Sequence, residues 1–435
     1  MRALLVAALA AQLAVVTGCG PADRGAGGAD ACSGRGCDVV DCADRGLPPT
    51  TISGTVYAPS GTLPLFGVNV YVPLGEPGPL ADGVQCSRCQ DALPGGSVVR
   101  TESGTTGAFS LADAPAGRDV PLVVQVGKWR RSIVVPEVRA CEDNPLPAEL
   151  TRLPRMAAEG DLPRIAIATG AWDALECLVL KLGVDVSEFT TDAGGGRVHL
   201  FDAGGANQVA GAVAAPAPAA LWASLDTLAQ YDVTLFSCQG AAFPAEKTQA
   251  MMDNVKQYAD RGGRVFLSHY HAIWIDGEVG NPAHAPGVWP GLATCDRLDT
   301  FDGRGVIDQV DNPKGASFAA WMTAVGGSPS PGEFEITEGR QTCSSIDLTR
   351  TERWVYQLTP DGQLPQQFQF STPVEVNGPE RCGKVVFSDM HVSSTSDSTP
   401  SVPFPGGCAG GDLTPQEKAL AFMLFDLSSC VGPLL

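Results

Sequence analysis

The chain opens with a positive charge and an apolar run that ends on a cysteine. Arg2 is followed by the apolar residues 3–16, and the run closes on Val16-Thr17-Gly18-Cys19. A positive start, an apolar stretch and small residues at the cleavage point are typical of a secretory signal peptide. Because the small residues end directly on a cysteine, we interpret residues 1–19 as a lipoprotein signal peptide with Cys19 as its lipidation site. An ordinary signal peptide that merely ends beside Cys19 is the alternative. In both cases the rest of the chain folds after export.

The cysteine content agrees with an oxidising compartment. The chain has 14 cysteines, so thirteen remain when Cys19 is set aside. A reducing cytosol rarely tolerates so many without metal sites. Because thirteen is odd, at least one thiol stays free, pairs between chains or is buried as a small apolar side chain.

The net charge and the hydropathy of the chain limit the kinds of partner that it can bind. The formal net charge is -19, and the basic residues are scattered, so a nucleic acid would be repelled and is excluded as a partner. No later segment is a membrane-spanning apolar run. The expected membrane anchor is therefore the lipid on Cys19. Gly20 rather than an aspartate follows it, which favours the outer membrane.

Composition then divides the exported portion. Residues 20–49 are rich in Gly, Ala and Asp and lack a sustained apolar period, which predicts a flexible tether. Its cysteines, Cys32, Cys37 and Cys42, have no common zinc spacing, so disulfides are favoured over metal ligation.

Residues 50–141 show short alternating strands between turn residues. Val68, Val70 and Val72 alternate with polar neighbours, which predicts a half-buried strand. Several such strands at this spacing predict a β-sandwich. The segments Ser53–Tyr57 and Gly107–Leu111, followed by Pro115-Ala116-Gly117, resemble the carboxypeptidase regulatory-like, transthyretin-like domain. The resemblance implies a spacer or adhesion element over about residues 51–139.

Further disulfides are expected in two places. Cys86 and Cys89 have the spacing of a redox pair or half a zinc site, but we favour loop disulfides with Cys141 as a further partner. Cys408 and Cys430 flank a C-terminal helix, and we expect them to bond to each other.

A linker over residues 142–162 leads into alternating strands and helices. Buried strands are predicted at 165–169, 233–236, 265–267 and 385–388, with helices at 174–182 and 245–260. This order predicts a three-layer α/β domain over residues 163–435 with a mostly parallel sheet, a flavodoxin-like arrangement, and an insertion at about 276–350.

Two histidine-bearing turns follow predicted strands. Ser268-His269-Tyr270-His271 follows the strand at 265, and Asp389-Met390-His391 follows the strand at 385. This layout resembles the class I glutamine amidotransferase-like fold and its trehalose-utilisation-like relatives. That family has a nucleophilic cysteine where this chain has His269. It also has a glutamate two residues after its catalytic histidine, and Ser393 stands there. Two of the three triad members are missing, so glutaminase activity is not expected.

Three interpretations of these strand ends remain open: a nucleophilic thiol, a metal site, or packing of buried side chains. Ser237-Cys238-Gln239-Gly240 follows a strand as a nucleophile would, although a buried or bridged thiol is favoured. His269, His271 and His391, with Asp389, form a candidate metal site, against simple packing of the imidazoles. The cofactor is thus either none or a divalent metal.

The sequence therefore predicts a lipid-anchored cell-surface protein with a binding or structural role and a degenerate amidotransferase-like domain. A cell-surface glycan or protein is the expected partner. The alternative is a hydrolase of glycans or peptides assisted by a metal or by His391, His269 and Asp389. Because parallel neighbours end at the same edge, His269 and His391 should face each other there.

Overall fold

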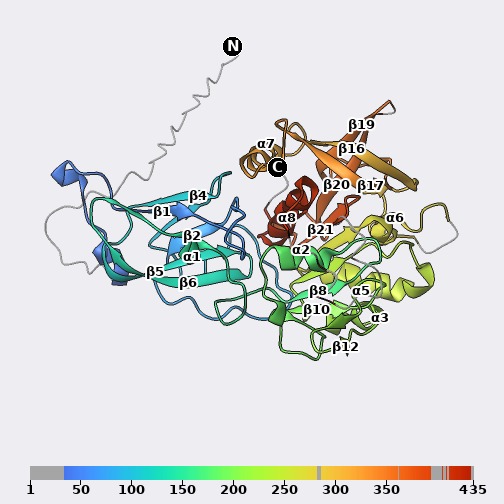
Figure 1. Cartoon of the computed structure of the whole chain (residues 1–435), viewed down its shortest axis with the longest axis horizontal. Coiled ribbons are helices and arrows are strands. Elements are labelled where there is room, and N and C mark those ends of the chain that lie inside the picture. Colours follow the sequence, from blue (N-terminus) through green and yellow to red (C-terminus); the bar gives the residue numbers. More distant parts are fainter. Residues whose placement is uncertain are drawn as a thin grey trace, which may run out of the picture. The chain divides into compact units, whose positions relative to one another are not determined.

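The computed structural model describes residues 34–281, 286–360, 362–392, 404, 408 and 411–432. These described residues belong to one compact unit. Most of the secondary structure is β, arranged in several sheets (Figure 1). The predicted signal peptide, the lipidation site Cys19 and the first part of the predicted tether lie outside the described residues.

Two small sheets form the N-terminal β module, which we define as residues 50–153. One has the strand order β4-β1-β7 and the other the order β3-β2-β5-β6. The strands are β1 (Thr51–Thr55), β2 (Asn69–Val72), β3 (Val99–Glu102), β4 (Ala108–Ala112), β5 (Gly117–Val126), β6 (Trp129–Val138) and β7 (Asp143–Pro145). In β4, buried side chains alternate with exposed ones, as a strand with one face on a core requires. Residues of both sheets, such as Ile52 and Val124, lie in one hydrophobic cluster.

The segment before this module, residues 34–49, is covalently linked to it. Residues 34–49 contain the short 3-10 helices η1 (Gly34–Asp38) and η2 (Ala43–Arg45). Cys42 is buried and forms a disulfide with Cys141 across 99 residues of sequence. The prediction of a flexible tether is therefore wrong for residues 34–49, because a polar composition does not reveal a covalent tie to a distant residue.

A ten-stranded mixed sheet forms the rest of the fold, in the order β17-β16-β19-β20-β21-β14-β13-β8-β10-β9. The strands are β8 (Ile165–Ala168), β9 (Phe189–Thr190), β10 (Val198–Phe201), β13 (Val233–Phe236), β14 (Arg264–Ser268), β16 (Asp299–Ile307), β17 (Glu333–Gln341), β19 (Glu352–Thr359), β20 (Gly362–Thr372) and β21 (Gly383–Ser388). The six strands from β9 to β21 pair in parallel, and β20, β19, β16 and β17 continue the sheet antiparallel. The predicted insertion at 276–350 supplies two of these antiparallel strands, β16 and β17.

Two further pairs of short strands lie outside the large sheet. β11 (Gln208–Val209) pairs with β12 (Val213–Ala214), and β15 (Ala293–Thr294) pairs with β18 (Ser345–Ile346).

Helices cover both faces of the parallel strands (Figure 1). Side chains of β8 show this directly, because Ile165 and Ile167 join one hydrophobic cluster while Ala166 and Ala168 join the other. The first cluster includes residues of α2 (Leu175–Lys181), α7 (Gly315–Ala324) and α8 (Pro415–Ser428). The second includes residues of α3 (Ala219–Trp222), α4 (Leu225–Leu228), α5 (Gln249–Asp260) and α6 (Ile273–Asp276). The remaining helices are α1 (Ala148–Thr151), η3 (Val186–Glu188), η4 (Pro244–Glu246), η5 (His269–Ala272) and η6 (Gly378–Glu380).

The sequence Thr414-Pro415-Gln416-Glu417 forms a capping box at the start of helix α8. The Thr414 side chain accepts a hydrogen bond from Glu417 N–H, and the Glu417 carboxylate accepts one from Thr414 N–H. The helix also packs against the β module, where its Phe425 lies 5.9 Å from Trp129 between ring centroids. The core is thus continuous between the two parts.

Five disulfides are present among the described residues, and two of them join the loop after β2 to the large sheet and the C-terminal segment. Cys86 pairs with Cys382, and Cys89 pairs with Cys430. Backbone hydrogen bonds reinforce the second link, because Cys89 N–H donates to Val431 O at 3.1 Å. The other three pairs are Cys42–Cys141, Cys177–Cys408 and Cys295–Cys343.

The predicted pairing of Cys408 with Cys430 is wrong. Cys408 bonds to Cys177 on α2, and Cys430 bonds to Cys89. Cys141, expected beside Cys86 and Cys89, bonds to Cys42 instead. Each bond joins segments far apart in the chain, so nearness in sequence misled the prediction.

No helix among the described residues has the length and hydropathy needed to cross a bilayer.

Candidate functional site

Three side chains converge at the carboxyl edge of the parallel strands. Cys238 lies two residues after β13, His269 follows β14 directly, and His391 lies three residues after β21. These three strands are adjacent and parallel, with Phe236 opposite Leu267 and Ser268 opposite Ser388. Parallel pairing in this register brings equivalent strand ends together, so the fold itself creates the cluster.

His269 occupies a sharp turn between strand and helix. Its φ is 45°, in the left-handed region that residues other than glycine rarely adopt, and η5 begins at the same residue. Strained backbone of this kind persists where the surroundings over-determine it, and it is concentrated at functional sites. The turn lifts the imidazole out of the sheet toward Cys238 and His391.

The distances within the cluster are short. Cys238 Sγ lies 3.2 Å from His269 Nδ1, and the rings of His269 and His391 are 5.5 Å apart between centroids. One potential donor atom from each of the three residues lies within 4.8 Å of the other two. All three side chains are buried, with exposed fractions of 0%, 3% and 1% for Cys238, His269 and His391. The predicted proximity of His269 and His391 is confirmed.

Burial keeps these groups uncharged. It raises the pKa of the Cys238 thiol to about 12. Burial, and then the charge of Arg340, lower the pKa of His269 to about 3. The pKa of His391 is held well below its usual value by burial and by its neighbours His269 and Arg340. At neutral pH the site therefore contains one thiol and two neutral imidazoles.

His391 carries an unsatisfied polar atom. Its Nε2 is buried and has no hydrogen-bond partner among the described residues. The backbone of His391 is fixed from α8, because Gln416 Nε2 donates to its carbonyl oxygen. The same side chain of Gln416 accepts from Thr337 N–H at 2.9 Å, so the segment holding the imidazole is anchored at a definite position.

His271 is turned away from the cluster. Its Nε2 pairs with Ser237 O at 3.0 Å, and its Nδ1 accepts from Trp274 Nε1 at 2.8 Å. Both ring nitrogens are used, and of the predicted metal set of His269, His271 and His391 the structure brings only His269 and His391 into one group of close donors. Residues 269–272 form a 3-10 helix with about three residues per turn, which directs positions i and i+2 to different sides. A strand would have put them on one face.

Asp389 is hydrogen-bonded to the segment that follows β17. Its carboxylate accepts from Thr342 N–H at 2.8 Å and from Thr342 Oγ1 at 2.5 Å. Burial raises its pKa to about 7. The structure does not bring this carboxylate into the group of three mutually close donors. It fixes the segment after β17 beside the strand that carries His391.

Two further buried carboxyl groups lie at this edge, and sequence reasoning missed both. Asp173 Oδ1 accepts from Val392 N–H at 2.8 Å, next to His391, and its Oδ2 has no partner among the described residues. Burial raises the pKa of Asp173 to about 7 and that of Glu176 to about 8. Their position after β8, another strand of the same parallel sheet, was the available signal.

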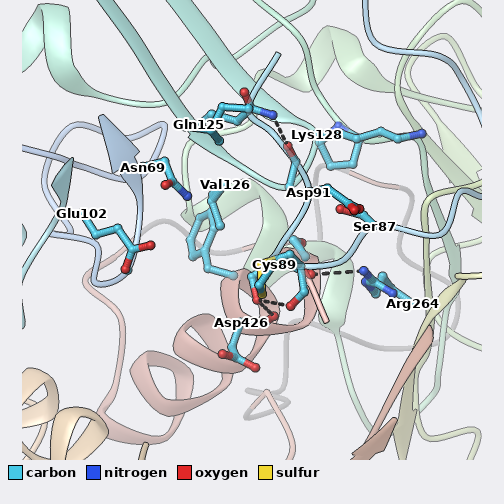
Figure 2. A pocket seen from close by; sticks show the side chains of 18 of the residues that line it. Asn69, Ser87, Cys89, Asp91, Glu102, Gln125, Val126, Lys128, Arg264 and Asp426 are labelled. Atoms are coloured by element: carbon cyan, nitrogen blue, oxygen red, sulfur yellow. Dashed lines mark hydrogen bonds between the residues drawn. A yellow bond between two sulfur atoms is a disulfide. The ribbon is translucent and has the colours of Figure 1, made fainter. Parts of the chain in front are cut away.

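A separate cavity of about 500 Å³ lies beside the starts of the parallel strands. Figure 2 shows that its lining combines Asn69, Glu102 and Gln125 of the β module with Arg264 and Asp426 of the rest of the fold. The Cys89–Cys430 disulfide also lies on its wall.

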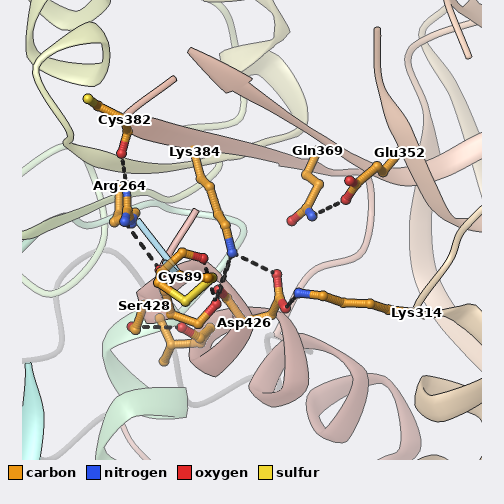
Figure 3. Close-up of polar contacts among 12 residues, drawn as sticks. Cys89, Arg264, Lys314, Glu352, Gln369, Cys382, Lys384, Asp426 and Ser428 are labelled. Carbon is orange, nitrogen blue, oxygen red and sulfur yellow. Dashed lines mark hydrogen bonds and ion pairs between the residues drawn. A yellow bond between two sulfur atoms is a disulfide. The ribbon is translucent and has the colours of Figure 1, made fainter. Parts of the chain in front are cut away.

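The buried charges on one wall of this cavity are already paired. Asp426 bridges Lys314 at 2.6 Å and Lys384 at 3.3 Å, and Figure 3 shows it between the two ammonium groups. Although burial acts to raise the pKa of Asp426, the two lysines hold it below its ordinary range. Arg264 donates to the carbonyl oxygens of Gly262, Cys382 and Ser429. We therefore interpret this region as a structural junction, and the cluster at the opposite edge as the candidate site.

Comparison with known proteins adds little. No family model and no curated protein matches the chain. Among solved structures, a protein from Bacteroides uniformis described as ThuA-like is 14% identical, covers 52% of this chain and 82% of its own, and gives a TM-score of 0.30. Two chains from type II cohesin–X-dockerin complexes of Acetivibrio cellulolyticus are each 16% identical. They cover 33% and 31% of this chain and 75% and 85% of their own, with TM-scores of 0.16 and 0.17. Likenesses this weak leave the function to be inferred from the site itself.

Proposed function

We propose that this chain is an exported, lipid-anchored protein that binds a ligand at the carboxyl edge of an amidotransferase-like α/β domain. In this proposal residues 50–141 are the transthyretin-like β-sandwich, 142–162 the linker and 163–435 the α/β domain. The parallel strand order and the helices on both faces support a fold of this kind. Ligands of such sheets bind at the carboxyl ends of the strands, where the cluster lies.

The observation that carries the proposal is the identity of the residue at the turn after β14. His269 has the left-handed backbone of a nucleophile turn, with φ 45°, but an imidazole stands where the resembled family has a thiol. His391 stands where that family has its catalytic histidine, and no carboxylate among the described residues accepts a hydrogen bond from its Nε2, which is unpaired there. Covalent acyl transfer needs an activated nucleophile and an oriented base. The carboxyl edge keeps the strand ends at which such sheets bind ligands but lacks these catalytic parts, which favours binding over catalysis.

Hydrolysis of a glycan or peptide, assisted by histidine or a metal, is the second candidate. It is favoured by the 3.2 Å contact between Cys238 Sγ and His269 Nδ1, which is within the reach of a nucleophile and its base. If hydrolysis uses this thiol–imidazole pair, Cys238 reacts with an electrophile, whereas in a binding site it does not.

That difference can be measured with a small thiol-directed electrophilic label such as iodoacetamide. Metal-free, non-reduced protein is incubated with the label, and adducts are located by peptide mass spectrometry. A binding protein gives no stoichiometric adduct on Cys238. A stoichiometric adduct that is lost in His269→Ala would establish a thiol–imidazole catalytic pair and overturn the binding proposal.

The proposed location rests on the cysteines. Five disulfides among the described residues suit an oxidising compartment, and Cys19 ends the apolar N-terminal run. In the proposal, lipid on Cys19 anchors the chain in the outer membrane, where a cell-surface glycan or protein is the partner. Cys19→Ser should move the protein from the membrane fraction to the soluble fraction, because the lipid is its anchor. Unchanged membrane fractionation of this variant would contradict the anchor.

A further inference from the structure

We propose that Cys238, His269 and His391 bind one zinc-class transition metal ion. The inference names the ligand of the carboxyl-edge site and so rests on the proposed binding function. The three residues come from the ends of three adjacent strands, and their donor atoms lie within 4.8 Å of one another.

The donor set fits this class of ion. Thiolate sulfur and imidazole nitrogen are the preferred ligands of zinc and of similar borderline-soft metals, whereas calcium and magnesium select oxygen ligands. Cys238 is the free thiol among the described cysteines, in a chain whose other described cysteines are bonded. The described cysteine that stays reduced therefore lies beside two imidazoles, as a metal ligand would.

The geometry needs only a small adjustment. In a tetrahedral zinc site with bonds of about 2.0–2.3 Å, the ligand atoms are about 3.3–3.8 Å apart. The 3.2 Å separation between Cys238 Sγ and His269 Nδ1 is slightly shorter than that spacing, and the full set lies within 4.8 Å. Small side-chain rotations would therefore complete the coordination.

A simple hydrogen bond does not explain the whole cluster. The thiol and His269 can satisfy each other, but His391 Nε2 stays buried and unpaired among the described residues. An unpaired buried nitrogen costs about 1–3 kcal/mol. A bound ion would give this nitrogen a partner.

Three protein ligands leave the fourth position of a tetrahedral ion for a water molecule or an external ligand. His271 and Asp389 are not available to fill it, because their polar atoms are already bonded to Ser237, Trp274 and Thr342. Binding replaces the thiol proton with the sulfur–metal bond, and one proton per ion is released to solvent. The site is therefore of the open kind that can hold a further ligand on the metal.

Cobalt(II) tests the proposal because it replaces zinc and is visible. The purified full-length protein, kept oxidised, is stripped with a chelator and titrated with Co²⁺. We expect one equivalent to produce a near-ultraviolet sulfur-to-cobalt charge-transfer band and tetrahedral d–d bands. One equivalent of Zn²⁺ should abolish both bands, and Mg²⁺ should leave them unchanged.

Three variants separate ligation from structural effects. Cys238→Ser changes size little and should remove the charge-transfer band. His391→Gln keeps the sulfur, so it should retain that band while weakening Co²⁺ binding by at least about tenfold. His199→Gln is the matched control, because His199 is equally buried but bonds Tyr231 Oη and Gly196 O and lies outside the cluster. It should bind cobalt as the wild type does.

The proposal is overturned if the wild type shows no charge-transfer band at saturating Co²⁺. It is equally overturned if Cys238→Ser and the wild type bind with the same affinity. If Cys238→Ser fails to fold, His391→Gln provides the test. An unchanged affinity of that variant for Co²⁺ would also contradict the proposed site. Failure here leaves the anchor and the absence of an adduct on Cys238 to be judged separately, because neither depends on a metal.

Discussion

Cys238 Sγ and His269 Nδ1 lie 3.2 Å apart although 31 residues separate them in the chain. The contact arises because β13 and β14 are parallel neighbours whose carboxyl ends meet at one edge. His391 joins them from β21, the next strand in the sheet. Three residues that are unremarkable one by one thus become a set of metal-type donors through strand order alone.

The packing behind this cluster leaves no room for a side chain at Gly170. A Cβ there would lie 2.2 Å from Cys238 O and 2.8 Å from the carbonyl carbon of Ser237. Gly170→Ala should therefore displace the backbone of Cys238 and lower the free energy of unfolding by about 1–3 kcal/mol. Gly195→Ala, where a Cβ meets nothing within 4 Å, is the matched control and should unfold like the wild type. Equal denaturation midpoints for the two variants would show that the loops are not in contact.

The two disulfides of the loop after β2 can be tested by gel electrophoresis of the cleaved protein. A protease site inserted between Ala157 and Ala158, both exposed, should allow cleavage between the β module and the large sheet. Because Cys86–Cys382 and Cys89–Cys430 cross the cut, the fragments should migrate as one species until a reductant is added. In Cys86→Ser/Cys89→Ser the fragments should separate without reductant under denaturing conditions. Separation of the unreduced wild type would refute this disulfide map.

The β module should fold alone only with revised boundaries. Residues 50–141 omit Cys42, the partner of Cys141, and β7, which pairs in parallel with β1. A fragment of residues 34–153, with Cys86 and Cys89 changed to serine, should unfold cooperatively. Loss of one disulfide typically costs about 2–4 kcal/mol, so 50–141 should be less stable by at least that amount. Circular dichroism during urea titration measures both, and equal stability would show that the added segments contribute nothing.

An acid-sensitive ion pair fastens the segment after α1. Glu159 accepts from both guanidinium nitrogens of Arg152, at 2.7 and 2.8 Å, and from Arg155 N–H at 2.8 Å. The bond to Arg152 lowers the pKa of Glu159 from 4.5 to about 2, against a smaller opposing effect of burial. A carboxyl group whose pKa is lower in the folded than in the unfolded state stabilises the fold fully at pH values above its unfolded pKa. This stabilisation is lost as the pH falls from about 4.5 toward 2.

Glu159→Gln should therefore cost about 1–3 kcal/mol at pH 7 and progressively less below pH 4.5. Glu137→Gln, on an exposed position of β6, is the control and should cost little at either pH. Urea midpoints at pH 7 and pH 3 make the comparison. A cost of Glu159→Gln that does not shrink at pH 3 would exclude the ion pair as its cause.

Local patterns predicted the elements around the site. The apolar runs at 165–169 and 233–236 are strands buried on both faces, and the capping box at Thr414 starts α8. The strands predicted before His269 and His391 are neighbouring parallel strands. Each of these signals lies within a few residues of the element that it specifies, so a single sequence can reveal it.

The parts that sequence reasoning missed depend on contacts between distant segments. His271 was expected beside His269, but η5 turns it toward Ser237, and Cys238 takes its place in the cluster. The disulfide partners lie between 48 and 341 residues apart, and the cysteine positions alone cannot choose among so many pairings. Asp173 reaches the edge only because β8 lies beside β13.

X-ray absorption at the zinc K edge tests the arrangement of Cys238, His269 and His391 most directly. The protein loaded with one equivalent of Zn²⁺ should show one sulfur at about 2.3 Å and two imidazole nitrogens at about 2.0–2.1 Å, with one further light atom completing four. The sulfur should disappear in Cys238→Ser. A first shell of oxygen and nitrogen atoms alone in the wild type would contradict a metal site at this edge.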